Sequence, residues 1–313
     1  MKVESHMTRI FIDGSAGTTG LRIRERLSER RDVELIVLSE EMRKDENARQ
    51  EALNCADVAF LCLPDVAAVE AAAMIENDRT AVIDTSTAHR TAPGWVYGFP
   101  EVNGLREQIR QSKRIANPGC HASGFIALVA PLVHAGLLGA NAQLSCFSIT
   151  GYSGGGKKMI AEYEGEGRRP LLDAPRQYGL SQQHKHLPEM AAVSGLSAPP
   201  CFCPIVADFY SGMEVSVPLF ASQIKGTPAQ IREIYREVYA GLVVRYVESP
   251  DEGGFLSAAA LSGNDGMEIS VSGNDARILL TARYDNLGKG ASGAAIQNLN
   301  LLLGADETAG LVL

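Results

Sequence analysis

The sequence predicts an α/β protein with two domains, one built on a parallel sheet and one of α+β type with a mostly antiparallel sheet. Short apolar runs alternate with helical patterns up to about residue 84, and this alternation is typical of a parallel sheet with right-handed crossovers. Beyond residue 120 most strand patterns follow one another without helices between them, which favours antiparallel pairing. The length of 313 residues suits two domains of about 100–200 residues each.

Local patterns predict each element of the first domain. An apolar run at residues 8–13 is followed by the helical periodicity of residues 21–27, and alanine-rich residues 66–75 form another clear helical pattern. The remaining strand-like runs of this domain lie at residues 34–38, 57–62, 80–84 and 114–116.

The second domain begins with an apolar helix expected from about residue 122 to residue 133, after a turn at Pro118-Gly119. A last helix, expected over residues 291–303, has glycines before it and an apolar face, so we expect it to return to the first domain and close it. The predicted domains are residues 1–119 with 286–313, and residues 120–285. Strand patterns of the second domain fall at about residues 142–150, 201–209, 214–220, 268–273 and 276–284.

A glycine-rich turn between the first strand and its helix predicts a dinucleotide site and a Rossmann-type first domain. Gly14 allows the tight turn, Gly17 lets the backbone approach a pyrophosphate, and Gly20 lets the helix pack on the strand. The helix N-terminus offers N–H groups to the phosphates. The spacing is GxxGxxG rather than GxGxxG, and the alternative is a plain tight turn. The expected cofactor contacts here are Gly14, Ser15, Gly17, Thr18, Thr19 and Gly20.

The end of the second strand favours NADP over NAD. An NAD site usually carries an acid there to accept from the ribose 2′-OH. This strand instead stops at Ser39, and Arg43 and Lys44 follow within reach of a 2′-phosphate. Because Glu40 and Glu41 lie between them, a solvated mixed-charge loop is the alternative.

Cys120 has the sequence context of a nucleophile. It follows Asn117-Pro118-Gly119 and precedes the apolar helix, so it lies at or near a helix N-terminus. The helix dipole and free N–H groups favour the thiolate, which is the reactive form. The alternative is a buried structural cysteine.

Two loops that follow strands are expected to bind anions. Arg90 follows the strand at residues 80–84, and it could clamp a phosphate or carboxylate; a loop salt bridge is the alternative. The stretch 151–158 also follows a strand, and its backbone N–H groups can form an anion nest with charge from a lysine. We expect substrate contacts from Ser153, Gly154 and Lys157.

His184 and His186 are the candidates for a general base, because histidine titrates near neutrality. If residues 184–186 are extended, both rings point to one face, and spacing alone does not choose between them. The pair Cys201 and Cys203 suggests zinc, but no third element has metal-site spacing, so we predict no metal.

Composition excludes several classes of protein. A net charge of −8 without a basic run argues against nucleic acid as a partner. No apolar stretch reaches the ~18 residues of a membrane span, and residues 1–6 lack the apolar core of a signal peptide. These residues look like a short extension before a natural start at Met7. Six cysteines without disulfide-rich spacing fit a reducing cytoplasm.

Together these motifs resemble the N-acetyl-gamma-glutamyl-phosphate reductase family in its shorter variety, from about Thr8 to about Leu303. That family belongs to the wider group of aspartate-semialdehyde dehydrogenase and glyceraldehyde-3-phosphate dehydrogenase. NPGC and the H-x-P-E segment are the most specific of the matching motifs. The motifs are GSAGTTG (14–20), STAHR (86–90), NPGC (117–120), GYSGGGKK (151–158), HKHLPEM (184–190) and DNLGKGASGAAIQNLN (285–300).

The resemblance implies an NADP-dependent reduction of N-acetyl-L-glutamyl 5-phosphate to the 5-semialdehyde, in arginine biosynthesis. It assigns Cys120 as nucleophile, His186 as base and Arg90 as a phosphate-binding candidate. The flanking His184 leaves some ambiguity about the base, and we expect it to contact the substrate. The glycine-rich stretch 288–293 would lie over the nicotinamide, with Asn286, Gly288 and Gly290 as contacts. We expect a small-molecule substrate and a homo-oligomer.

Three alternatives remain at the level of sequence. One is an acyl-phosphate reductase of the aspartate-semialdehyde dehydrogenase kind. The substrates of the two enzymes differ by an acetamido group and one methylene, and local motifs do not distinguish them. Another is a non-catalytic dinucleotide-binding sensor, against which Cys120 and His186 argue. The third is a cysteine hydrolase or acyltransferase without a cofactor, against which the glycine-rich turn argues.

Overall fold

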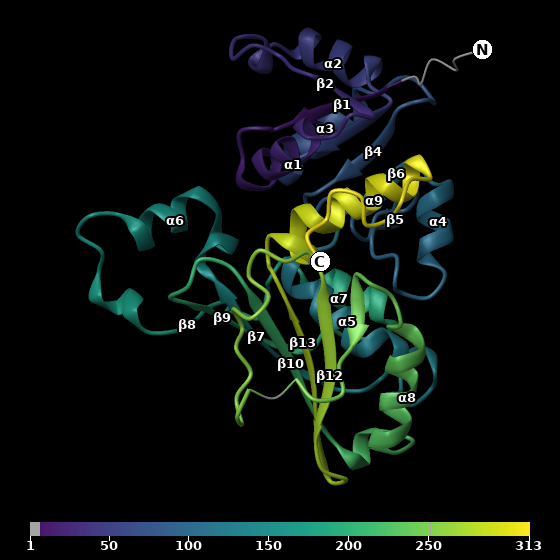
Figure 1. The fold of residues 1–313 in the computed structure, drawn as a ribbon, viewed down its shortest axis with the longest axis vertical. Helices are drawn as coiled ribbons and strands as arrows, with labels where there is room; N and C mark the ends of the chain where they lie inside the picture. Colours follow the sequence, from purple (N-terminus) through teal and green to yellow (C-terminus); the bar gives the residue numbers. More distant parts are fainter. Residues whose placement is uncertain (1–6, 251) are drawn as a thin grey trace.

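Two sheets, one in each half of the molecule, organise the chain (Figure 1). The structure is a computed structural model that describes residues 7–250 and 252–313. The opening extension expected at residues 1–6 lies outside the described residues. Within the described ranges, no helix is long and apolar enough to cross a bilayer.

The first sheet is parallel throughout, with strand order β2-β1-β3-β4-β6-β5, as predicted. Strands β3 and β4 are buried along their whole length, as expected for a parallel sheet with helices on both faces. The elements are β1 (Thr8–Asp13), α1 (Thr18–Ser28), β2 (Val33–Ile36), α2 (Glu46–Cys55), β3 (Val58–Leu61), α3 (Asp65–Ala73), β4 (Ala81–Asp84), β5 (Val96–Tyr97), α4 (Leu105–Gln111) and β6 (Arg114–Ala116).

Helix α2 was not predicted. It follows β2 and precedes β3 in the chain, and it packs against β1 of the sheet. Only Ala52 and Leu53 of this helix are buried, so its apolar pattern is weak. Its start is stabilised locally, because the Asp45 carboxylate accepts a hydrogen bond of 2.7 Å from the Ala48 N–H. Strand β2 also ends at Ile36, two residues earlier than expected.

The second sheet has the order β11-β12-β13-β10-β7-β9-β8. Its strand pairs are antiparallel except β7 with β9 and β11 with β12, which are parallel. The prediction of a mostly antiparallel sheet is therefore confirmed, and the two parallel pairs make the sheet mixed. The strands are β7 (Ser145–Gly151), β8 (Arg176–Gln177), β9 (Cys201–Ala207), β10 (Met213–Phe220), β11 (Val244–Tyr246), β12 (Met267–Gly273) and β13 (Arg277–Tyr284).

More helices connect these strands than the sequence analysis expected. Helices α6 (Gly156–Glu164) and α7 (Leu187–Ser194) lie between β7 and β9, and α8 (Pro228–Val238) lies between β10 and β12. A local signal for α8 is present, since Thr227 and Gln230 form a capping box and Pro228 occupies the first turn.

Helix α5 (Cys120–His134) forms the core of the second half and is buried along most of its length. It packs against β10, β13, α7 and α8. Pro131 has no N–H for the Ala127 carbonyl four residues earlier, and the Tyr239 hydroxyl donates to that carbonyl instead at 2.6 Å. The helix therefore continues through Pro131 without a break. Its first residue, Cys120, lies at the opposite end, beside the cavity.

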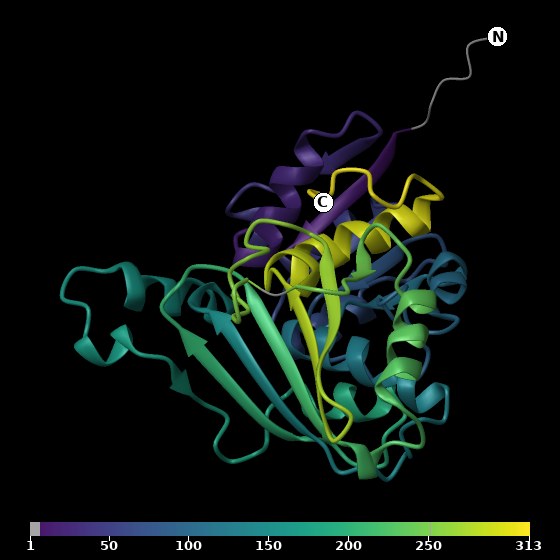
Figure 2. The same cartoon turned by 60° about the horizontal axis from the view of Figure 1, so that its bottom comes forward.

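The last helix, α9 (Gly293–Leu303), returns to the first half as predicted. It continues a π-helical turn over Gly288–Ser292. Its buried side chains Ile296 and Leu299 join the core of the first sheet, and the helix packs against α4, α1 and β4. Figures 1 and 2 both show this yellow helix between the two sheets.

Candidate active site

A solvent-open cavity of about 1450 Å³ lies where the two halves meet. Its walls come from the start of α1, the carboxyl ends of β3, β4 and β6, the loop after β7 and the turn before α7. In open α/β sheets, ligands bind outside the carboxyl ends of the strands. The sequence-predicted residues that line it are Gly17, Thr18, Thr19, Gly20, Arg90, Cys120, Ser153, Gly154, His184, His186, Asn286 and Gly290.

The glycine-rich turn has the geometry of a phosphate loop. Gly14 has φ +84°, and a Cβ there would lie 2.2 Å from the Cys62 carbonyl oxygen. A Cβ at Gly20 would lie 2.5 Å from the Gly14 carbonyl oxygen, so the helix packs closely on the turn. Gly17 is the N-cap of α1, and nothing lies closer than 3.5 Å to a Cβ there. The turn thus exposes backbone N–H groups to the cavity.

A second cavity, open to solvent, adjoins this turn at the ends of β1 and β2. Gly14, Ser15 and Arg43 line it, whereas Ser39 and Lys44 do not. The Arg43 guanidinium is held by the Leu38 carbonyl at 3.2 Å. The two cavities on either side of one glycine loop suit the two ends of an extended dinucleotide.

Three residues of this second cavity, Asp13, Arg24 and Arg49, were missed by sequence reasoning. Asp13 ends β1 and is buried against Arg49 of α2, with 2.8 Å between the guanidinium and the carboxylate. Exposed Arg24 lines the same cavity and has no hydrogen-bond or ion-pair partner within the described part of the chain. Arg49 could not be found from the sequence, because helix α2 itself was not predicted.

Cys120 lies at the N-terminus of α5, and its N-cap Gly119 contributes no side-chain cap. Burial raises the pKa of the Cys120 thiol, while the Arg90 charge and the His121 N–H oppose that rise. The thiol is therefore protonated near neutral pH and needs a base before it can attack. The Tyr284 hydroxyl anchors the Cys120 carbonyl at 2.6 Å, and Gly290 leaves room beside the Cys120 Cβ.

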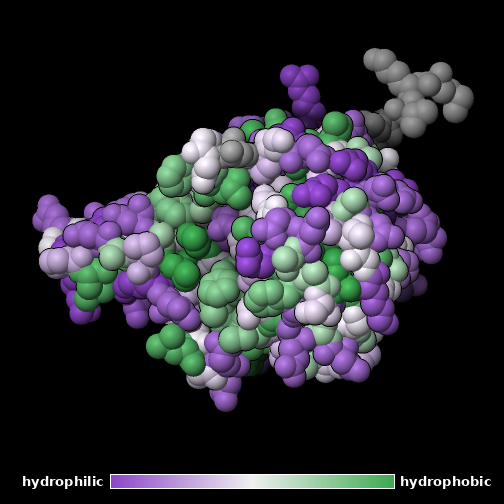
Figure 3. Space-filling view, turned by 90° about the horizontal axis from the view of Figure 1, so that it is seen from below, coloured by the Kyte–Doolittle hydropathy of each residue, from purple (hydrophilic) through white to green (hydrophobic). Residues whose placement is uncertain are grey.

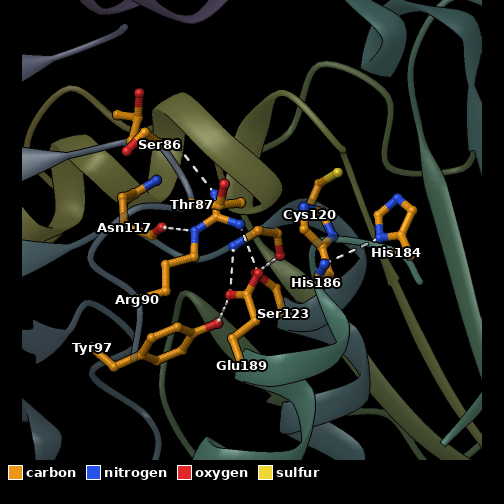
Figure 4. A network of polar contacts seen from close by, with 12 residues as sticks. Ser86, Thr87, Arg90, Tyr97, Asn117, Cys120, Ser123, His184, His186 and Glu189 are labelled. Atoms are coloured by element: carbon orange, nitrogen blue, oxygen red, sulfur yellow. Dashed lines mark hydrogen bonds and ion pairs between the residues drawn. The ribbon is translucent and has the colours of Figure 1, made fainter. Parts of the chain in front are cut away.

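Arg90 is held by three acceptors (Figure 4). Its guanidinium donates to Glu189 Oε1 at 2.6 Å, to the Asn117 carbonyl at 2.9 Å and to the Thr85 carbonyl at 3.2 Å. Glu189 in turn accepts from the Tyr97 hydroxyl and the Gly119 N–H. The salt-bridge alternative of the sequence analysis is thus realised, and an anion contact by Arg90 stays a prediction.

His186 is the N-cap residue of α7 with helical dihedral angles, so residues 184–186 are not extended. The sequence analysis placed both rings on one face only if this segment was extended, and that condition is not met. The His186 N–H donates to His184 Nδ1 at 3.2 Å, and the two rings pack edge to face. A Cβ at Gly119 would lie 2.6 Å from His186 Nε2, so the imidazole abuts the residue before Cys120.

Burial, and then the Arg90 charge, hold the pKa of His186 well below its usual range. Burial likewise lowers the pKa of His184 to about 4. His186 is therefore neutral at physiological pH, which is the form that can accept a proton. Among the described residues, His186 makes no hydrogen bond to Cys120 Sγ. In structures without substrate, catalytic hydrogen bonds are often long or poorly aligned, and they tighten when the substrate binds.

His121 was missed, although it follows the nucleophile directly. Its ring is buried at 3% exposure and lies 2.6 Å from both the Ser148 and the Tyr178 hydroxyl oxygens. Burial lowers its pKa to about 3. Tyr178 comes from a segment that carried no recognisable signal.

The loop after β7 is tied to the segment before α9. The Asn286 side chain donates to Ser153 Oγ at 3.0 Å and accepts from the Gly212 N–H at 2.9 Å. Gly154 is exposed at the cavity, but Lys157 is exposed and does not line it. Gly288 is buried against the Asn264 carbonyl and also lies off the cavity wall. Roles for Lys157 and Gly288 stay predictions.

Acidification from pH 7 to pH 5 should destabilise the fold. An unfolded histidine takes up a proton below pH 6.5, whereas folded His121 stays neutral down to about pH 3. Stability is therefore lost as pH falls below 6.5, by roughly 1.4 kcal/mol per pH unit for this residue alone. Urea unfolding at several pH values measures the slope. A His121→Gln variant with the wild-type slope would contradict this assignment.

Family models and curated proteins match this chain over most of its length. Residues 9–112 match the family model of the semialdehyde dehydrogenase NAD binding domain, and residues 120–286 match that of the semialdehyde dehydrogenase dimerisation domain. A curated N-acetyl-gamma-glutamyl-phosphate reductase 2 from Nostoc sp. is 45% identical over 97% of this chain and 99% of its own. An N-acetyl-gamma-glutamyl-phosphate reductase from Chelativorans sp. is 48% identical over 94% of this chain and 98% of its own.

Solved structures share the fold. Aspartate semialdehyde dehydrogenase II from Vibrio cholerae, complexed with ASA, superimposes with a TM-score of 0.73 at 17% identity, covering 96% of this chain and 99% of its own. Aspartate semialdehyde dehydrogenase from Candida albicans, with NADP, gives 0.67 at 14% identity, covering 95% and 99%.

Proposed function

The chain belongs to the N-acetyl-gamma-glutamyl-phosphate reductase family of semialdehyde dehydrogenases, and on that premise we propose that Cys120 and His186 perform its chemistry. The enzyme is an oxidoreductase that reduces an acyl phosphate with a nicotinamide dinucleotide. Its reaction, N-acetyl-L-glutamyl 5-phosphate to N-acetyl-L-glutamate 5-semialdehyde, is a step of arginine biosynthesis. One observation carries the residue assignment: a neutral buried imidazole abuts the residue before a thiol at a helix N-terminus.

The reaction proceeds through a thioester on Cys120. His186 accepts the thiol proton, and the thiolate attacks the acyl carbon while phosphate leaves with the electrons of its C–O bond. A reduced nicotinamide held in this cavity would supply the hydride for reduction of the thioester to a thiohemiacetal. Uncapped first-turn N–H groups of α5 stabilise the oxyanion. Collapse of the thiohemiacetal oxyanion expels the thiolate and releases the aldehyde, and protonated His186 returns its proton to the sulfur.

The charges around Cys120 suit an acylated amine. Among the described residues, Asp65 is the acid that lines this cavity, and its carboxylate already accepts from the Thr87 N–H and hydroxyl. A free ammonium group would need an unpaired carboxylate there. Lys185 lines the cavity and has no partner within the described ranges, so it can receive the phosphate or carboxylate of the substrate.

The cofactor is a nicotinamide dinucleotide, and NADP is the proposed form. Arg43→Ala should weaken NADPH binding about 10- to 100-fold and NADH binding far less, because a charged hydrogen bond to the 2′-phosphate is worth about 1.5–3 kcal/mol. Lys44→Ala is the matched control, since Lys44 does not line the adjoining cavity. Fluorescence titration measures both affinities. An equal loss of NADPH and NADH in the Arg43 variant would contradict the 2′-phosphate contact.

The family model names a dimerisation domain, and the second sheet offers a surface for it. Strand alternation leaves Phe147, Ile149 and Ile205 on the face opposite the helices, where Phe147 is 44% exposed. Figure 3, which views the molecule from below, shows hydrophobic side chains near the middle of that side. We propose a homo-oligomer through the sheet face that carries Phe147. Sedimentation should show a monomer for Phe147→Asp and an oligomer for the wild type; matching profiles would argue against it.

The reaction itself is tested in reverse. Enzyme, NADP+, N-acetyl-L-glutamate 5-semialdehyde and phosphate should give NADPH absorbance, and omission of phosphate should abolish it. Aspartate semialdehyde should react far more slowly. We propose that the reaction takes place in the cytoplasm, since all six cysteines are free and free thiols persist in reducing compartments.

A further inference from the structure

A chain of neutral hydrogen-bonding groups lies beside the nucleophile and has no part in the steps above. It runs from the Ser148 hydroxyl of β7 through the His121 ring to the Tyr178 hydroxyl, with 2.6 Å at each link. Ser148 and His121 are buried, and His121 and Tyr178 line the same cavity as Cys120.

The hydrogen-bonded chain of Ser148, His121 and Tyr178 stays uncharged across the working pH range. Burial lowers the pKa of His121 to about 3 and raises the pKa of Tyr178 well above its usual value. A neutral imidazole has one N–H and one lone pair, so protons can be arranged along the chain in two ways. In one, Tyr178 accepts from His121 and its own O–H is free to donate; in the other, it donates to His121 and its lone pairs are free. Either arrangement leaves one hydrogen-bonding site towards the cavity.

Tyr178 is fixed from two further sides. Its N–H donates to the Pro204 carbonyl at 3.0 Å, and its ring packs against Tyr163, Leu172 and Val206. Apolar Val206 and Met159 line the cavity as well. A neutral polar group with apolar neighbours suits a small amide with a methyl group, and it would leave an ammonium ion without a counter-charge.

We propose that the Tyr178 hydroxyl, positioned by His121, binds the acetamido group of the substrate and so contributes to selection of the acylated amine. This rests on the proposed function, since the acetamido group is the part of that substrate which a neutral chain recognises. Tyr178 is the specificity residue, and His121 acts through it.

The test compares two aldehydes in the reverse assay. N-acetyl-L-glutamate 5-semialdehyde and 5-oxopentanoate have the same chain length and carboxylate, and only the first carries the acetamido group. Tyr178→Phe should lower the ratio of their kcat/KM values about tenfold, mainly through KM of the acetylated substrate. His121→Gln should lower the ratio in the same direction. An unchanged ratio in Tyr178→Phe would overturn the inference.

Tyr152→Phe is the matched control. Tyr152 packs against the same apolar cluster, but its hydroxyl bonds Glu164 and does not line the cavity. This variant should keep the wild-type ratio, and an equal fall would attribute the effect to packing and overturn the inference. If the wild type fails to oxidise the acetylated aldehyde, the proposed function fails with it. If the wild type oxidises it and the ratio does not respond to Tyr178→Phe, only the present inference fails.

Discussion

Replacing Cys120 with serine should remove nearly all turnover while leaving the protein folded. A hydroxyl in this position is not ionised by a neutral imidazole to a useful extent, so the thioester cannot form and kcat should fall at least about 10³-fold. The fold should tolerate the change because serine is nearly isosteric. The backbone contact of residue 120, its carbonyl to the Tyr284 hydroxyl, is also retained. Steady-state kinetics and thermal unfolding measure the two effects.

The control for this variant is Cys203→Ser, on strand β9 and away from the cavity, which should keep wild-type kcat. Alkylation by iodoacetamide is an independent check. Because burial raises the pKa of Cys120, labelling should be slow at pH 7 and faster as pH rises. Cys62 also lines the cavity, so the label must be assigned by mass spectrometry. Full labelling of Cys120 with intact activity would refute the covalent mechanism.

Replacing His186 with asparagine should lower kcat about 10²- to 10⁴-fold, the usual contribution of a general acid–base. The neutral form of His186 is the active one, and activity is lost as pH falls through its pKa. Since burial and Arg90 hold that pKa well below the usual value of 6.5, the acidic limb of the kcat/KM profile should lie below pH 6.5. In the His186→Asn variant that limb should disappear.

The matched change is His184→Asn. His184 lines the cavity and accepts the His186 N–H, so its loss should mainly raise KM. Burial lowers the pKa of both histidines, so only the pH profiles of both variants separate their roles. A flattened acidic limb in His184→Asn, with a wild-type profile in His186→Asn, would reverse the assignment of the base.

The parts of the fold that were predicted from sequence are those with a local pattern. The apolar strands around the first sheet, the glycine turn and apolar helix α5 each depend on residues that are neighbours in the chain. Helix α2 was missed because it buries little of its surface, so its apolar pattern is weak. Helix α7 was missed although Pro188 in its first turn is a local start signal.

Placing the candidate nucleophile, base and glycine loop needed only short motifs, since a helix N-terminus or a phosphate turn is specified by a few consecutive residues. The surroundings that set their chemistry come from distant parts of the chain. Arg90 meets Glu189 across 99 positions, and His121 meets Tyr178 across 57. Burial and charge at a site are sums over everything packed around it, so the protonation of Cys120 and His186 follows only from the folded arrangement. The same holds for the neutral chain that ends at Tyr178, because a strand, a helix start and a distant loop must come together before its hydroxyl faces the cavity.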